Sequence, residues 1–169
     1  MNIFIHRRDF RLIDNTTLIN MSKNIDNICP IFIFTPEQIK KNKYFSNNLV
    51  QFMCESLEDL HKQYMSKDSK LYFYYGDVID VLNSIHKKYT IKNVGFNIDY
   101  SPYSKKRDNL IEKWCNKNDI TLWKNEDMLL VNIIDQKNYP NKEPYKVFTP
   151  FLNYQKSNFK ISNPVTKKI

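Results

Sequence analysis

Two short segments of the chain hold most of the side chains that could do chemistry. The first is His6-Arg7-Arg8-Asp9-Phe10-Arg11, and the second runs from Asn97 through Asp99 and Tyr103 to Arg107 and Asp108. Guanidinium groups bind carboxylates and phosphates through a fixed fork of N–H donors, and they stack on aromatic rings. A crevice lined by arginines, a carboxylate and aromatic rings would suit a flat heteroaromatic ligand with polar or anionic edges.

The same segments also have a purely structural interpretation. Arg8, Asp9, Arg107 and Asp108 could pair with one another and fix the shapes of two loops without binding any ligand. The other reactive residue types give weaker signals. His6, His61 and His86 lack metal-ligand spacing, so no metal site is expected. The three cysteines are far apart and are expected to be reduced thiols.

The elements that must position the two segments alternate along the chain. Strand-like runs cover residues 2–6, 28–34, 71–75, 92–98 and 120–123, and apolar residues at helical spacing lie between them. This alternation is typical of βαβ units with right-handed crossovers. We predict an α/β, Rossmann-like fold, with a five-stranded parallel sheet in the order 3-2-1-4-5 and helices on both faces. The first and fourth strands are neighbours in that order, so both segments would line one crevice at their carboxyl ends.

The alternation stops after about residue 124, which predicts a change of organisation. We expect an α/β domain at residues 1–131 and a polar connector at 132–169, interrupted by Pro140 and Pro144. Within the connector we expect a short helix near residues 149–156 and a mobile, lysine-rich tail.

The composition limits the function classes. The formal charge is +8, but only four of the 26 cationic residues are arginines and alanine is absent, as A+T-rich codon usage would produce. We therefore expect DNA binding by the lysines to be non-specific. The chain has two glycines, Gly76 and Gly95, which excludes both GxGxxG and P-loop motifs. Without an apolar run of membrane or signal-peptide length, we expect a soluble, intracellular protein in the cytoplasm or nucleus, or in a viral factory if the source is viral.

Several motifs resemble the DNA photolyase/cryptochrome family. Arg7-Arg8-Asp9-Phe10-Arg11, followed by Asp14-Asn15, is similar to the opening motif of that family. Asn97-Ile98-Asp99-Tyr100-Ser101-Pro102-Tyr103, with Arg107-Asp108, is similar to its Asn-x-Asp-x-x-Pro-Tyr…Arg-Asp segment. Tyr145-Lys146-Val147-Phe148-Thr149-Pro150-Phe151 is similar to the segment that begins its interdomain connection. The motifs occur in the family order over about residues 1–155.

The resemblance implies the N-terminal α/β domain of enzymes that repair pyrimidine dimers by light-driven electron transfer from reduced flavin. In this family the domain can hold an antenna chromophore, either a deazaflavin or a reduced folate, and a deazaflavin-type site lies more within the α/β domain. Motif position implies antenna contacts at Arg11, Phe34 and Asp99, with Asn97 and Tyr103 as further candidates.

The FAD-binding helical domain of the family has no counterpart in the sequence. We therefore expect no catalytic residues and no FAD on this chain, and we expect repair to need a FAD-binding domain on a separate chain. Two alternatives remain open from the sequence. The chain could be a stand-alone, non-catalytic module that binds a chromophore or nucleotide, or the remnant of a broken photolyase gene.

Overall fold

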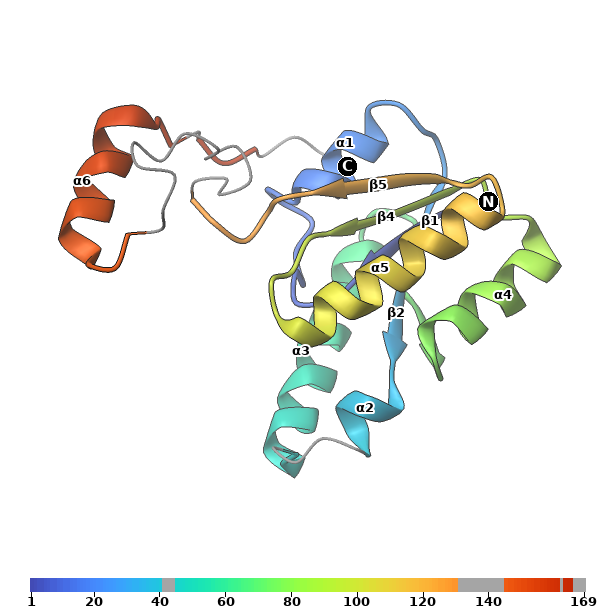
Figure 1. Ribbon diagram of the computed structural model, residues 1–169. Coiled ribbons are helices and arrows are strands. Elements are labelled where there is room, and N and C mark those ends of the chain that lie inside the picture. The colour runs from blue at the N-terminus through green and yellow to red at the C-terminus, as the bar shows by residue number, and fades with distance from the viewer. Residues whose placement is uncertain (41–44, 131–144, 162, 166–169) are drawn as a thin grey trace.

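The computed structural model describes residues 1–40, 45–130, 145–161 and 163–165, and its centre is a five-stranded parallel sheet (Figure 1). The strands are β1 (Asn2–His6), β2 (Ile28–Phe34), β3 (Tyr72–Tyr75), β4 (Asn93–Asn97) and β5 (Thr121–Asn125). Their order is β3-β2-β1-β4-β5, and every pair is parallel. The predicted fold class and strand order are confirmed.

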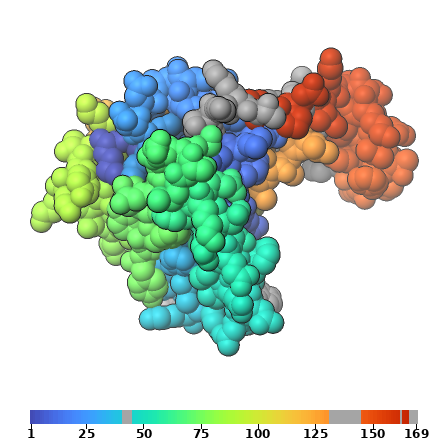
Figure 2. All heavy atoms as spheres, turned by 180° about the vertical axis from the view of Figure 1, so that it is seen from behind, coloured from blue at the N-terminus to red at the C-terminus, as the bar shows by residue number. Residues whose placement is uncertain are grey.

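Helices cover both faces of the sheet, as predicted (Figure 1). Helices α1 (Thr16–Ser22) and α3 (Asn47–Met65) pack on one face, and α4 (Val78–Tyr89) and α5 (Pro102–Lys117) pack on the other. A four-residue helix, α2 (Pro36–Ile39), follows β2. Figure 2 shows the molecule from behind, with the green and cyan surface of α3 across the front.

The alternation of side chains along β1 divides the core between the two faces. Ile3 and Ile5 point toward α4 and α5, where they pack with residues such as Leu82 and Ile111. Phe4 points to the opposite face and packs in a cluster that includes Leu60 of α3. Packed side chains shield both faces of the central strands from water. This explains why these strands appear as almost continuous apolar runs in the sequence.

Gly95 in β4 allows α1 to lie close to the sheet. A Cβ atom built on Gly95 would collide with the Sδ atom of Met21 and would lie 3.3 Å from the Cγ2 atom of Thr17, both on α1. A glycine at this position therefore brings the first turns of α1 against the end of β4, next to the segments singled out above.

Strand β3 forms one edge of the sheet and is made entirely of aromatic residues. Tyr72, Phe73 and Tyr75 are exposed, whereas Tyr74 is half-buried against the core under α4 and α5. The strand is therefore only partly covered by the helical layers.

A further helix, α6 (Phe148–Asn158), includes the segment expected to be helical. Figures 1 and 2 show it beside the layered sheet rather than on either face. The start of the expected connector, residues 132–144, lies outside the described residues. Nearer the end of the chain, Val165 exchanges two hydrogen bonds of 2.9 Å with Asp14, in the loop before α1. Among the helices described, none combines the length and the apolar character that a membrane span requires.

Candidate functional site

The loops after β1 and β4 line one cleft at the carboxyl ends of these neighbouring strands. The cleft has a volume of about 330 Å³. We call it the arginine cleft, and its lining residues are Arg7, Arg8, Asp9, Arg11, Asn97, Ile98, Asp99, Asp127 and Met128. It lies where the strand order reverses, because β1 leads on one side to β2 and on the other to β4. Ligands of open parallel sheets bind at such reversal points.

The first turn of α1 is hydrogen-bonded to residues that line this cleft, and side chains from three segments cap its N–H groups. The Thr16 N–H donates to Asp127 Oδ1 at 2.8 Å, and the Thr17 N–H donates to Asn97 Oδ1 at 3.0 Å. The Leu18 N–H donates to the Oδ1 atom of the N-cap residue Asn15. Backbone donors in the first turn of a helix have no partner within the helix, so these contacts satisfy three of them.

A buried cluster of Asp9, Asn15 and Asn97 joins the loop after β1 to this helix start. The Asp9 carboxylate accepts hydrogen bonds from the side-chain amides of Asn15 and Asn97 and from the Arg7 backbone N–H. Asn97 also donates to Asn15 Oδ1 at 2.9 Å. Each carboxylate and amide oxygen in the cluster has a donor, so the cluster is stable although water cannot reach it.

Arg7 lies beneath the cleft with its side chain only 8% exposed. Its Nη1 atom is 2.8 Å from Asp108 Oδ1 and donates to the Asn97 carbonyl oxygen, and its guanidinium lies 3.8 Å from the centre of the Phe96 ring. Burial and the neighbouring Arg107 lower the pKa of Arg7 to about 10, against the opposing effect of Asp108. The side chain remains cationic at neutral pH.

Two arginines form the rim of the cleft. The Arg8 side chain is 68% exposed, and its Nε atom lies 3.6 Å from Asp99 Oδ2, which is too long for a hydrogen bond. The Arg11 side chain is 42% exposed, and its Nη2 atom donates to Asp127 Oδ2 at 2.6 Å and to the Asp14 carbonyl oxygen. The Arg11 side chain is thus held in one orientation, whereas the Arg8 side chain is free to rotate toward a ligand.

Asp99 is fixed by the start of α5. Its carboxylate accepts the Ser101 N–H at 3.1 Å and the Ser104 hydroxyl at 2.8 Å. Burial alone would raise the pKa of Asp99, but these hydrogen bonds and the nearby Arg8 and Arg107 lower it below its usual value. Asp99 therefore stays ionised and balances part of the charge of the arginines.

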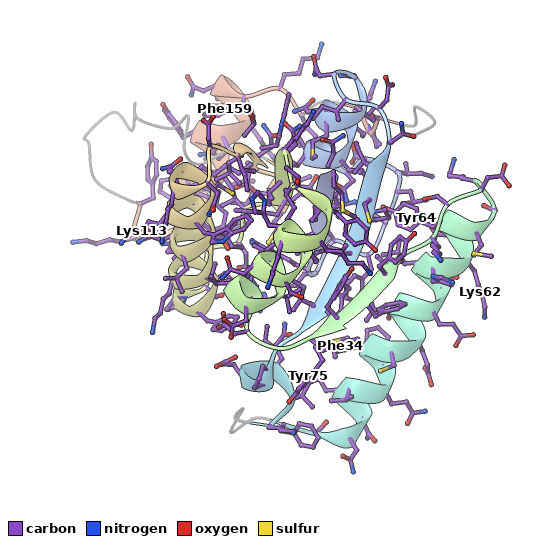
Figure 3. The ribbon with its side chains drawn as sticks, turned by 90° about the vertical axis from the view of Figure 1, so that its right-hand side faces the viewer. Phe34, Lys62, Tyr64, Tyr75, Lys113 and Phe159 are labelled. Atoms are coloured by element: carbon purple, nitrogen blue, oxygen red, sulfur yellow. The ribbon has the colours of Figure 1, made fainter. Side chains whose placement is uncertain are left out.

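Tyr103 and Phe34 lie away from the cleft opening, although both were expected to contact a ligand there. The Tyr103 hydroxyl is 3.1 Å from Thr35 Oγ1, so it joins the start of α5 to the end of β2. Phe34 stacks near Phe32 and Phe73 and lines a separate apolar groove against α3. Figure 3 shows Phe34 and Tyr75 at the same end of the sheet. Of the five expected contacts, the structure places Arg11, Asn97 and Asp99 in the arginine cleft and the other two outside its lining.

The expected network of loop residues is divided in the structure. Arg107 and Asp108 do interact, because Arg107 Nε donates to Asp108 Oδ1 at 3.2 Å. The same oxygen also binds Arg7. Asp9 bonds to amides rather than to a guanidinium, and Arg8 lies nearer to Asp99.

Two further contributors to the site, Thr17 and Asp127, are not among the residues expected from the sequence. Asp127 follows the last strand, and its contact with Thr16 spans 111 residues, so only the strand order could have suggested it. Asn15 belongs to the opening motif, but its hydrogen bonds with Asp9 and Asn97 depend on the tertiary structure.

His6 serves the core rather than the cleft. Its Nδ1 atom is 3.1 Å from the Asp9 carbonyl oxygen, and its Nε2 atom is 2.7 Å from the Tyr64 hydroxyl. Because a carbonyl only accepts, Nδ1 carries the proton and Nε2 accepts from Tyr64. Figure 3 shows Tyr64 on the side of α3 that faces the sheet. Among the described residues, no group of three or more His, Cys, Asp or Glu side chains could hold a metal ion.

These features define an α/β domain with a cleft at the reversal point of a parallel sheet. A model of the DNA photolyase family matches residues 2–167, and the chain belongs to this family. The chain is 32% identical to the deoxyribodipyrimidine photo-lyase of Buchnera aphidicola over 157 residues, and 30% identical to Cryptochrome-1 of Anopheles gambiae over 142 residues. These alignments cover 89% and 79% of this chain, but 32% and 26% of the relatives.

Solved structures agree with this assignment. An archaeal photolyase from Sulfolobus tokodaii superposes with a TM-score of 0.86 at 35% identity, covering 99% of this chain and 37% of that protein. Its crystal structure contains two FAD molecules and is described as implicating a novel light-harvesting cofactor. A Synechocystis cryptochrome shares the fold, with a TM-score of 0.85 at 16% identity. The chain thus spans about a third of the length of the relatives that it matches.

Proposed function

We propose that the chain is the antenna domain of a light-dependent DNA repair enzyme of the photolyase type, and that the arginine cleft holds its chromophore. The observation that carries the proposal is the position of the cleft at the reversal point between β1 and β4. The light-harvesting cofactor ascribed to the Sulfolobus tokodaii relative supports this proposal. When bound, such a chromophore would absorb light and pass excitation energy to a catalytic flavin.

The residues of the cleft fit a flat chromophore with polar edges. Arg8 and Arg11 present guanidinium donors at the rim, and Ile98 and Met128 supply apolar lining. The volume of about 330 Å³ is at the lower end of the range for small-molecule sites. A flavin or deazaflavin ring has both the flat shape and the polar edges that this lining can contact.

We further propose that repair itself depends on a FAD-binding helical domain supplied by a separate chain. Membership of the photolyase family supports the dependence of repair on a FAD-binding domain. The partner would bring the catalytic flavin, whereas this domain would position the antenna.

A binding experiment tests the antenna proposal. The purified chain is titrated with FMN, an 8-hydroxy-5-deazaflavin and methenyltetrahydrofolate, and binding is followed by fluorescence anisotropy. We expect saturable 1:1 binding of at least one chromophore, weakened in the variant Arg8→Ala. The exposed Lys113 on α5, which points away from the sheet in Figure 3, provides a matched control as Lys113→Ala. Absence of binding by all three chromophores would refute the antenna proposal.

The partner proposal needs its own experiment. The chain is co-expressed with a FAD-binding photolyase domain encoded near its gene, and the pair is assayed for loss of cyclobutane dimers under blue light. We expect co-purification and a rate of repair higher than that of the FAD-binding chain alone. Separate elution of the two chains, with an unchanged repair rate, would count against a separate-chain partner.

A further inference from the structure

Strand β3 is a sheet edge without a charged residue or a proline. On one side it pairs with β2, and on the other side it has no strand partner in the described part of the chain. Natural sheet edges are commonly protected from further pairing by charged side chains or prolines. The opposite edge, β5, contains Lys124, which pairs with Glu112, whereas β3 consists of four aromatic residues. The edge formed by β3 is therefore the one that is open to another strand.

The direction of the backbone groups of β3 follows from one hydrogen bond. The Gly76 N–H donates to the Phe34 carbonyl oxygen of β2 at 3.0 Å. Along a strand the backbone groups of successive residues point to opposite sides, so every second residue of β3 is bonded to β2. Leu71, Phe73 and Tyr75 are in the other phase, and their N–H and C=O groups point outward, away from β2.

His61 closes the first of these outward positions. Its Nδ1 atom donates to the Leu71 carbonyl oxygen at 3.2 Å. Phe73 and Tyr75 remain, with 45% and 55% exposure, and Tyr75 is visible near the end of the strand in Figure 3. Two outward residues separated by one inward residue have the spacing of one hydrogen-bonded repeat of a β-ladder. The edge thus offers two adjacent bonding positions to a further strand.

The charges around the two ends of β3 have opposite net signs. Cations exceed anions among the exposed residues before the strand, Lys67, Asp68 and Lys70. Anions exceed cations among the exposed residues around its carboxyl end, Lys40, Asp77 and Asp80. A second copy in antiparallel orientation would bring its acidic end beside the basic end of the first copy, whereas a parallel copy would bring like charges together. The edge is therefore complementary to itself in the antiparallel orientation.

We propose that two copies of the chain dimerise by antiparallel pairing of their β3 strands, about a two-fold axis that passes beside Tyr74. In this register Phe73 of each copy faces Tyr75 of the other, and both pairs exchange backbone hydrogen bonds. Tyr74 faces its own counterpart, and Tyr72 covers Gly76 of the other copy, as aromatic residues do for glycines at sheet edges. The two sheets would become one continuous sheet, and the bonding positions left open by β2 and His61 would all be used.

Analytical ultracentrifugation of the intact chain tests the dimer. Four strand residues from each copy form a small interface, so we expect a reversible rise of the mean mass from one chain toward two between about 5 and 500 µM. Tyr75→Lys places a charge on the pairing edge and should weaken association at least about tenfold. Leu110→Lys, at an exposed position of α5, is the matched control and should leave association unchanged. Lys70→Glu should weaken the dimer by a smaller factor, and this effect should shrink at high salt.

Disulfide trapping tests the register, because Tyr74 alone would face its own counterpart. In an antiparallel pair, facing residues that are not hydrogen-bonded have Cα atoms about 4.5 Å apart, within reach of a disulfide. The variants are made with Cys54→Ser, which removes the exposed native thiol. Oxidation should then give a covalent dimer with Tyr74→Cys and much less of it with Tyr72→Cys, and circular dichroism checks that both variants are folded.

Several outcomes would overturn the inference. A chain that stays monomeric at about 500 µM would do so, as would association that Tyr75→Lys leaves intact. Stronger crosslinking at Tyr72 than at Tyr74 would refute the register, and growth beyond two chains would indicate open-ended aggregation. Protection of the β3 amides from hydrogen exchange only when a FAD-binding chain is added would assign the edge to that chain. None of these outcomes affects the chromophore titration, because the arginine cleft is lined by no residue of β3.

Discussion

The side-chain oxygen of Asn97, at the end of β4, accepts the backbone N–H of Thr17 at 3.0 Å. The same carboxamide donates to Asp9 and to Asn15. One buried side chain thus holds the loop after β1, the first turn of α1 and the end of β4 in fixed relative positions. The arginines of the cleft are placed precisely because these buried groups beneath them are held in position.

Replacing Asn97 should therefore destabilise the fold strongly. We expect Asn97→Ala to lower the free energy of unfolding by about 2–4 kcal/mol, because it leaves the buried Thr17 N–H without an acceptor and removes one donor each from Asp9 and Asn15. Urea unfolding followed by circular dichroism measures the loss. Asn116→Ala, at an exposed position of α5, is the control and should change stability by less than about 0.5 kcal/mol. Similar losses in the two variants would contradict the role given to Asn97.

Asp127 and Arg8 should differ in the same assay, although both line the cleft. Asp127→Ala removes the acceptor of the Thr16 N–H and hydroxyl and the partner of Arg11, so we expect a loss of about 1–3 kcal/mol. Arg8→Ala should stay within about 0.5 kcal/mol of the wild type, because its side chain is mostly exposed. A large loss in Arg8→Ala would mean that this arginine stabilises the loop instead of remaining free for a ligand.

The close contact between α1 and β4 gives a prediction about Gly95. Gly95→Ala should destabilise the protein by about 1–3 kcal/mol, because the new methyl group would overlap Met21 and crowd Thr17. In the double variant with Met21→Ala, the methyl group would fill part of the space that the methionine vacates. We expect the loss in the double variant to be smaller than the sum of the single losses by at least about 0.5 kcal/mol. Additive losses would show that the two residues do not compete for space.

His6 should make stability depend on pH in the mildly acidic range. Burial lowers the pKa of His6 below 6.5, although Asp9 opposes the effect, so the unfolded chain takes up a proton more readily than the folded protein. The stabilisation that neutral His6 contributes should be fully present above about pH 6.5. It should fall by at most about 1.4 kcal/mol per pH unit as the pH drops below that value toward the lowered pKa of the folded state.

Urea midpoints at pH 8, 7, 6 and 5 measure this dependence, with His6→Gln as the comparison. The variant should lose stability less steeply between pH 6.5 and 5. Asp99 does not mask the effect, because its pKa is lowered and its charge persists through this range. Parallel curves for the wild type and His6→Gln would contradict the assignment of the pH dependence to His6.

The sequence predicted the framework of the site better than its contacts. Strand order follows from the alternation of apolar runs, and this order alone brings Arg11, Asn97 and Asp99 to one cleft. The expectation for Phe34 rests instead on its motif position in the family. However, its side chain points to the face covered by α3, since neighbouring residues on a strand point to opposite faces. The direction of one side chain at a strand end depends on the local twist and packing, which a single sequence does not show.

Arg7 illustrates the same limit from the other side. In the sequence it stands between His6 and Arg8 and reads as one more charge in a basic run. In the structure it is buried against Phe96, with Asp108 from α5 as its partner. Its neighbour Arg8, one residue away, remains in solvent. Arg7 and Arg8 are adjacent in the sequence, but Arg7 is buried and Arg8 is exposed. The position of α5 determines which of the two is buried.

The capping of α1 also sets an order for folding. The acceptors for the Thr16 and Thr17 N–H groups lie 111 and 80 residues further along the chain, so this helix start cannot be completed while only the first βα unit exists. Contacts between such distant residues form late, because closing a long loop costs entropy before any contact is gained. During synthesis, the N-terminal unit would have to wait for β4 and Asp127 to leave the ribosome, and the arginine cleft would then take shape as the last step of assembly.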